Sequence, residues 1–223
     1  NYFYLKWLIK IILSIFIFFI IILILMKWIN PPTTTVILAE QLSLNRKVIQ
    51  EWRTIDKIGK NLILSVLAAE DSNFCNHYGV DFAEIYKAKE KGFSRGASTI
   101  SQQVSKNLFL WRNRSWFRKG LELIITMMLE TFWSKKRILE VYLNIAETGN
   151  GYFGIQAISN VRFKKNSYQL TLREASYIAV TFPNPKKRNA TKLTSELKQR
   201  AKSIRIGANT LRLESRASCV IDS

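Results

Sequence analysis

The pattern of apolar positions divides the chain into a continuous apolar stretch near its start and a longer part with helical periodicity. Residues 11 to 26 read IILSIFIFFIIILILM and contain no charge. As a helix, the 22 residues from Trp7 to Trp28 would extend roughly 33 Å, enough to cross a hydrocarbon core of about 30 Å. Tryptophans at both ends favour the two membrane interfaces. Residues 1–29 are therefore predicted to be a transmembrane anchor with a short flank.

A cleaved signal peptide is the alternative for this stretch. Its apolar region would be shorter and followed by small residues, whereas KWINPP follows here, without an A-x-A-like site. Lys6 and Lys10 before the span, against Lys27 after it, favour a cytoplasmic N-terminus. We therefore expect an uncleaved anchor with the rest of the chain outside the cytoplasm.

Beyond the anchor the apolar pattern is helical. Residues 30–36 contain two prolines and are expected to be an extended linker. Leu62, Val66 and Ala69 share one face at helical spacing. Further helices are expected in the ranges 115–133, 134–147, 171–182 and 195–206, and the motifs Thr99-x-x-Gln102 and Thr171-x-x-Glu174 are typical of capping boxes.

No sustained alternation of period two occurs, apart from a short stretch around Ile49–Ile55. The fold class is thus predicted to be mainly α. We expect one domain over residues 37–207, and a tail over 208–223 whose weak periodicity favours disorder.

Charge and cysteine count narrow the class of partner. The formal net charge of +18 favours a polyanionic partner: nucleic acid, an anionic membrane surface or a phosphorylated substrate. Cys75 and Cys219 are far apart and have no zinc-binding spacing, so two free thiols and no metal site are expected.

The first chemical candidate is the run AAEDSNFCNHYGVDF, residues 68 to 82. On a continuous helix, Glu70, Phe74 and His77 would fall on one face at i, i+4 and i+7. A carboxylate next to an apolar wall has a raised pKa, as a general base working near neutral pH requires. The structural alternative is a helix-end acid paired with His77.

The second candidate is GASTISQQVSKNLFL, residues 96 to 110. Thr99, Gln103 and Lys106 at i, i+4 and i+7 would place a hydroxyl, an amide and an ammonium on one face, a set that can hold a phosphate. A solvated polar face is the alternative. The absence of any acid between Gly92 and Glu122 argues against it.

Glu122 is the second candidate carboxylate. Arg118 precedes it at i, i+4, so a structural ion pair is the alternative to a catalytic role. The dense cations around it are Arg112, Arg114, Arg118 and Lys119. Two carboxylates and a cationic cluster are suited to sugar transfer from a phosphate leaving group, because one acid deprotonates the attacking hydroxyl while the cations stabilise the departing pyrophosphate.

These motifs resemble those of the monofunctional biosynthetic peptidoglycan glycosyltransferases, glycosyltransferase family 51, which are related to the first module of class A penicillin-binding proteins. EDSNFCNHYGVD is similar to the family's E-D-x-x-F-x-x-H-x-G, and GASTISQQVSKNLFL to its G-[AG]-S-T-[IL]-[ST]-Q-Q-x-x-K-N. RKGLE resembles R-K-x-x-E, and KKRILEVYLN resembles R-I-L-E-x-Y-L-N. The motifs follow one another in family order.

The resemblance implies a lysozyme-like helical domain with a small membrane-facing lobe. Glu70 matches the catalytic base, and Glu122 the acid that assists departure of the lipid pyrophosphate. Substrate and pyrophosphate binding is implied for Lys106, Arg118, Lys119, Gln102, Gln103, Ser98, Thr99, His77, Asp71 and Phe74. Glu140, Tyr142 and Asn144 are interpreted as structural.

The function so implied is polymerisation of lipid II into β-1,4-linked glycan strands, with inversion and release of undecaprenyl pyrophosphate. The partners would be lipid II, the growing glycan, membrane lipids and other cell wall synthesis proteins, with no nucleic acid. No cofactor is required by the motifs, although a divalent cation, Mg or Mn, at the pyrophosphate stays open. The enzyme would sit in the bacterial inner membrane with its catalytic domain on the periplasmic side.

Two other functions stay open from the residues alone. A lysozyme-like enzyme that cleaves peptidoglycan would use one raised-pKa carboxylate but would have little need of Lys106, Arg118 and Lys119. An anchored basic module that binds an anionic polymer would need neither Glu70 nor Glu122.

Overall fold

The computed structural model describes residues 2–90, 92, 96, 98–113 and 115–221. The described chain is mainly helical, which confirms the predicted fold class. The α-helices are α1 (Tyr2–Leu25), α2 (Thr35–Leu44), α3 (Lys60–Glu70), α4 (Phe82–Glu90), α5 (Ile100–Phe109), α6 (Trp116–Phe132), α7 (Lys135–Ile145), α8 (Ile155–Phe163), α9 (Leu172–Ala179) and α10 (Ser195–Leu213). Short 3-10 helices are η1 (Ile55–Lys57), η2 (Phe74–Asn76) and η3 (Ser167–Gln169).

A small sheet lies at one side of the helices. Its strands are β1 (Ile49–Gln50), β2 (Glu147–Gly149) and β3 (Tyr152–Phe153), in the order β1-β3-β2. β1 runs parallel to β3, and β2 antiparallel to it. The brief alternation near Ile49 thus corresponds to a two-residue strand.

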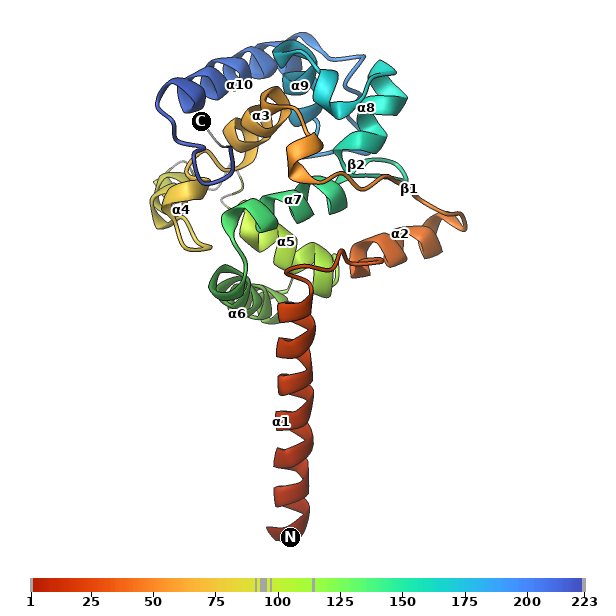
Figure 1. Cartoon of the computed structure of the whole chain (residues 1–223), viewed down its shortest axis with the longest axis vertical. Coiled ribbons are helices and arrows are strands. Elements are labelled where there is room, and N and C mark those ends of the chain that lie inside the picture. Colours follow the sequence, from red (N-terminus) through yellow and green to blue (C-terminus); the bar gives the residue numbers. More distant parts are fainter. Residues whose placement is uncertain (1, 91, 93–95, 97, 114, 222–223) are drawn as a thin grey trace.

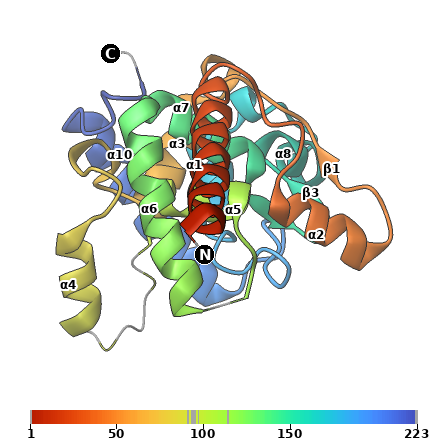
Figure 2. The same ribbon diagram turned by 90° about the horizontal axis from the view of Figure 1, so that it is seen from below.

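The N-terminal helix α1 projects from the rest of the molecule (Figure 1). It is long and apolar enough to cross a membrane, with a mean hydropathy of 3.3 in its most apolar window. Most of its side chains are exposed, but Leu23 near its end is fully buried. Seen from below, α1 stands against the face formed by α5 and α6 (Figure 2).

The helices begin where the sequence predicts caps. The Thr99 and Thr171 side chains each form a complete capping box, at the starts of α5 and α9. Ser115 caps α6 and Ser134 caps α7, since each hydroxyl accepts a hydrogen bond from a backbone N–H three residues later. α2 begins at Thr35, inside the range expected to be linker, because Thr34 caps it. The boundaries proposed at residues 29, 36 and 207 stay predictions.

The core lies between two groups of helices. α10 packs on α3 and α9, and α5 packs between α6 and α7. The expected stripe on α7 faces this core, because Ile138, Val141, Tyr142 and Ile145 are all buried. Figure 1 shows the first group farther from α1 and the second group next to it.

The prediction of two free thiols is wrong, because Cys75 and Cys219 form a disulfide with a Cα–Cα distance of 5.7 Å. α10 runs on to Leu213, and turns after it bring Cys219 back to η2 although 144 positions separate the two cysteines. Ala217 and Val220 beside Cys219 are buried. The described residues 208–221 therefore form helix and packed turns, where weak periodicity favoured disorder.

Candidate active site

Glu70 is the last residue of α3, and the helix ends there because the following segment has other partners. The backbone N–H of Asp71 still bonds to Leu67 O, but Phe74 begins the 3-10 helix η2 and His77 has extended backbone. The expectation that Glu70, Phe74 and His77 share one helical face is therefore wrong. Phe74 is instead a core side chain, 1% exposed.

The half-buried Glu70 carboxylate lines a cavity of about 280 Å³ together with Asp71, Ser98 and Thr99. Gln103 reaches this carboxylate from α5, and its Nε2 donates a hydrogen bond of 2.9 Å to Glu70 Oε2. The structure thus brings the predicted base and the predicted amide together, from segments 33 positions apart.

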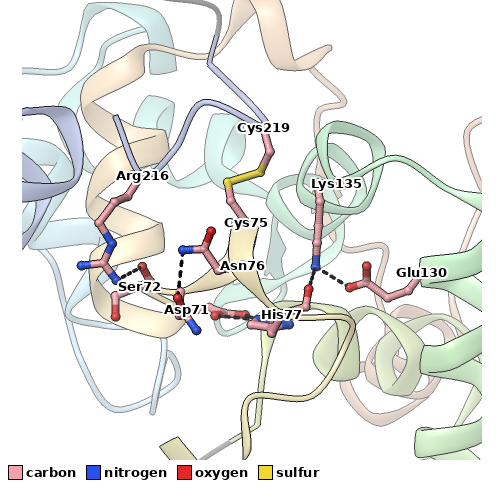
Figure 3. Close-up of a disulfide and its surroundings, with 10 residues drawn as sticks. Asp71, Ser72, Cys75, Asn76, His77, Glu130, Lys135, Arg216 and Cys219 are labelled. Carbon is pink, nitrogen blue, oxygen red and sulfur yellow. Dashed lines mark hydrogen bonds and ion pairs between the residues drawn. A yellow bond between two sulfur atoms is a disulfide. The ribbon is translucent and has the colours of Figure 1, made fainter. Parts of the chain in front are cut away.

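Asp71 and His77 hold the segment after α3 in place. The Asp71 carboxylate accepts a 2.9 Å hydrogen bond from the backbone N–H of Ile100 and lies 3.0 Å from His77 Nε2. The carbonyl of His77 accepts a 2.7 Å bond from Lys135 Nζ, which also pairs with Glu130 at 2.8 Å (Figure 3). These contacts fix the positions of Asp71 and His77, although His77 Nδ1 is buried without a hydrogen-bond partner among the described residues.

The disulfide reaches the same segment from the other side. Cys75 lies in η2, and Arg216 Nη2 donates a 3.2 Å bond to the carbonyl of Ser72 (Figure 3). The segment between Glu70 and His77 is therefore fixed covalently to the turns after α10 and by hydrogen bonds to α5 and α7.

A second cavity, of about 470 Å³, adjoins the first, since Ser98 lines both. Its lining includes predicted residues from the two helices α5 and α6: Gln102, Gln103, Lys106, Arg118, Lys119 and Glu122. The two predicted carboxylates therefore line neighbouring cavities, Glu70 in one and Glu122 in the other.

Glu122 is buried and paired with two cations. Arg118 Nη1 lies 2.5 Å from Glu122 Oε2, and Lys119 Nζ lies 2.5 Å from Glu122 Oε1. Arg118 also donates from Nε to the carbonyl of Asn113 at 3.1 Å, and its side chain is 9% exposed. The ion pair left open by the sequence thus exists, and it is buried.

Lys106 differs from these cations because its ammonium forms no hydrogen bond or ion pair with any described residue. Burial lowers its pKa; nearby Glu122 acts in the opposite direction, and the charges of Arg118 and Lys119 lower the pKa further. An unpaired, poorly solvated cation next to two others is a site for an anion with several oxygens.

Thr99 and Gln102 have structural partners. The Thr99 hydroxyl donates to Gly79 O at 2.6 Å and accepts from the backbone N–H of Gln102. Gln102 Oε1 accepts from the Thr99 N–H at 3.0 Å, and the residue is 2% exposed. On the predicted phosphate-binding face, Thr99 and Gln103 line cavities but are hydrogen-bonded within the protein, which leaves the ammonium of Lys106. At the edge of the second cavity, Ser98 accepts a hydrogen bond from Lys119.

The wider cationic cluster is only partly assembled at the cavity. Arg112 also lines it but forms ion pairs with Glu40 and Glu147 at 2.8 and 3.0 Å. Arg114 lies outside the described residues. Three members of the predicted cluster, Arg112, Arg118 and Lys119, thus line this cavity together with Lys106.

Two residues next to the site were not predicted to touch it. The buried Tyr142 hydroxyl donates to Gln103 Oε1 at 3.4 Å, and burial raises the pKa of this phenol well above its usual range. Tyr142 therefore stays protonated and orients the Gln103 amide. Glu147 lines a third cavity with Lys106 and Tyr142, and burial raises its pKa. The apolar stripe of α7 gave Tyr142 a core role only, and no motif marked Glu147.

Glu140 and Asn144 have the structural roles expected. Glu140 Oε2 accepts from the backbone N–H of Ile55, and Asn144 Oδ1 accepts from that of Arg53. Both side chains therefore fix the segment leading into α3.

The sequence is similar to those of known proteins over most of its length. The family model described as Transglycosylase matches residues 37–207. The biosynthetic peptidoglycan transglycosylase of Jannaschia sp. is 43% identical over 189 residues, covering 85% of this chain and 79% of the relative. The protein of that name from Pseudomonas syringae pv. syringae is 44% identical over 195 residues, covering 82% and 81%. The one from Mannheimia succiniciproducens is 52% identical over 149 residues, covering 65% and 61%.

Proposed function

Because the chain belongs to the transglycosylase family and is a peptidoglycan glycosyltransferase, we propose that its two adjoining cavities bind the acceptor and the donor of glycan polymerisation. The donor would be lipid II, and the product a β-1,4-linked strand formed with inversion and release of undecaprenyl pyrophosphate. The supporting observation is the ammonium of Lys106, which pairs with no residue that the structure describes and lies in a cavity that also contains Arg118 and Lys119 and adjoins that of Glu70.

Glu70 is the general base in this proposal. Its carboxylate takes the proton of the acceptor sugar's 4-hydroxyl as that oxygen forms a bond to C1 of the donor sugar, and the bond from C1 to the pyrophosphate oxygen breaks. The hydrogen bond from Gln103 restricts rotation of the carboxylate, and Tyr142 restricts the amide in turn. The base is thereby held in one orientation before substrate arrives.

The cations act on the leaving group. Lys106 contributes a charge that forms no ion pair with the described residues, and Arg118 and Lys119 contribute donors that the departing pyrophosphate would share with Glu122. Because both Glu122 oxygens are paired in this state, we assign Glu122 two effects: it positions Arg118 and Lys119, and it assists departure of the pyrophosphate.

A divalent cation would depend mainly on substrate oxygens. Among the described residues no group of three or more histidine, cysteine, aspartate and glutamate side chains could hold a metal ion. Mg²⁺ is commonly bound by one or two carboxylates together with substrate phosphates. Glu122 is the carboxylate in the donor cavity that could contribute to such binding.

We place the catalytic domain on the periplasmic side of the bacterial inner membrane. The apolar helix α1 supports membrane anchoring. The disulfide supports an oxidising compartment, since disulfides persist outside the cytoplasm and are rare within it. Lipid II, the growing strand, membrane lipids and other cell wall synthesis proteins are the proposed partners.

The test is polymerisation of labelled lipid II by detergent-solubilised protein, with Glu70→Gln as the comparison. The variant keeps the shape but cannot accept the proton, so we expect polymerisation to fall by at least about 10²-fold while lipid II binding persists. Near wild-type synthesis by the variant would refute the assignment of the base. Cleavage of preformed glycan in place of polymerisation would favour a lysozyme-like enzyme.

A further inference from the structure

Arg137 of the catalytic domain forms several hydrogen bonds to the segment at the end of the membrane helix. α1 ends at Leu25, and the turn that follows it presents backbone carbonyls to the domain. Arg137 on α7 donates to two of them: its Nη2 donates to Met26 O and Ile29 O, each at 2.9 Å, and its Nε to Met26 O at 3.2 Å. Nη1 donates to Asn30 Oδ1 at 2.9 Å.

The arginine itself is held firmly. Nη1 also donates to Glu140 Oε1 at 2.6 Å, and Glu140 is bonded to the backbone before α3. The guanidinium lies over the rings of Trp52 and Trp133, 5.6 and 5.7 Å from their centroids. The Arg137 side chain is 10% exposed, so it forms part of the packed interior.

Other contacts fix the direction of α1 as well as its end. Trp133 Nε1 donates to Leu23 O at 2.8 Å, and Leu23 is fully buried. Four residues earlier, the Phe19 ring meets Phe109 of α5 edge-on, with centroids 5.2 Å apart. Contacts at these two successive turns hold α1 in one orientation on the domain, and Figure 2 shows α1 lying against α5 and α6.

The surface that α1 contacts and the donor cavity are formed by the same two helices, α5 and α6. α5 contributes Gln103 and Lys106 to the cavity, and α6 contributes Arg118, Lys119 and Glu122. A fixed α1 therefore sets the height and tilt of this cavity relative to the membrane that α1 enters. A donor whose lipid tail is embedded in the bilayer can offer its pyrophosphate only at the interface, so the height of the cavity matters.

We propose that Arg137 is a positioning residue that aligns the donor cavity with the membrane-embedded substrate. The inference rests on the proposed function, because it needs a lipid-linked donor. It predicts that variants of Arg137 lose polymerisation activity only on donors embedded in a bilayer. A donor with a short, water-soluble lipid can approach the cavity from any height.

The experiment compares two donors with the full-length protein reconstituted in liposomes. One is lipid II embedded in the same bilayer, and the other is a short-chain analogue added from water. For Arg137→Ala we expect the rate with the embedded donor to fall about tenfold or more, and the rate with the soluble donor to change less than about twofold. Arg137→Lys should show a smaller loss of the same kind, because lysine cannot reproduce the fork geometry.

The matched control is Lys136→Ala, which removes a cation from the neighbouring position of the same helix, where Lys136 Nζ pairs with the exposed Asp56 at 2.9 Å. Its ratio of the two rates should equal that of wild type. Trp133→Phe keeps an aromatic ring but loses the bond to Leu23 O, and provides a second test should Arg137→Ala fail to fold. Equal losses with both donors in the variants would mean a purely structural role and overturn the proposal. Wild-type protein that polymerises neither of the two donors would instead refute the proposed function.

Discussion

The side-chain amide of Gln103 donates a 2.9 Å hydrogen bond to Oε2 of Glu70, from the second turn of α5 to the last residue of α3. The bond joins the two most distinctive motifs of the sequence. Glu70 also lines the first cavity, so this bond orients a carboxylate that faces the space proposed for the acceptor.

Gln103→Met should lower kcat by roughly ten- to a hundredfold. A hydrogen bond to a charged group is worth about 1.5–3 kcal/mol, and about 1.4 kcal/mol is a factor of ten in rate. KM for the donor should change little. Steady-state kinetics with lipid II measure both constants. Tyr142→Phe, which removes only the 3.4 Å contact to Gln103, should cost less, and a larger loss for Tyr142→Phe would contradict this order.

The lowered pKa of Lys106 gives a prediction about pH. A lysine with a lowered pKa loses its proton at a lower pH than an exposed lysine, and only the charged form attracts pyrophosphate. KM for the donor should therefore begin to rise below the usual lysine range as pH increases. Lys106→Arg keeps its charge, and its KM should stay flat over the same range. Identical pH profiles for the two proteins, measured between pH 7 and 10, would exclude Lys106 as the titrating group.

The buried pair of Arg118 and Glu122 predicts that stability and turnover can be separated. Removing one partner of a buried pair costs about 3–5 kcal/mol, and Lys119 should reduce that cost here because it also pairs with Glu122. We expect Arg118→Met to lower the unfolding free energy by about 2–3 kcal/mol. Adding Glu122→Gln should restore part of this without restoring turnover. Thermal melting and lipid II turnover are measured side by side, and recovered turnover in the double variant would show that the pair is only structural.

The disulfide predicts a response to reductant that is easy to assign, because the chain has two cysteines. Losing a native disulfide typically costs 2–5 kcal/mol in small secreted domains. At about 2–4 °C per kcal/mol for a chain of this size, dithiothreitol should lower Tm by roughly 4–20 °C. A Cys75→Ser/Cys219→Ser variant should melt at the lower temperature and be insensitive to dithiothreitol. An unchanged wild-type Tm after verified reduction would contradict a stabilising role.

Local features were predictable from sequence because their causes are local. Thr99 and Thr171 begin their helices where a hydroxyl and an amide or carboxylate lie three residues apart, and both capping boxes form. Arg118 and Glu122 pair because four positions on a helix bring side chains together. The family motifs identified the candidate residues, and the cavities collect Glu70, Lys106 and Glu122 on neighbouring elements.

Long-range features were not predictable because their partners lie far apart along the chain. α3 stops at Glu70 since Asp71 bonds to Ile100, a contact that no local pattern encodes. Cys75 meets Cys219 because α10 lies across α3, and the thiols alone do not reveal that crossing. Arg137 reads as one cation among three in KKR, yet its partners are carbonyls more than a hundred positions earlier.

The bond between Cys75 and Cys219 also makes the chain a closed ring from η2 to the turns after α10. Every helix from α4 to α10 lies inside that ring, including both helices that line the donor cavity. One cut by a protease within it would therefore release no fragment. Such a nicked protein would migrate near full length on a non-reducing gel and separate into two pieces only after reduction, so intact mass on a non-reducing gel is no proof of an intact backbone.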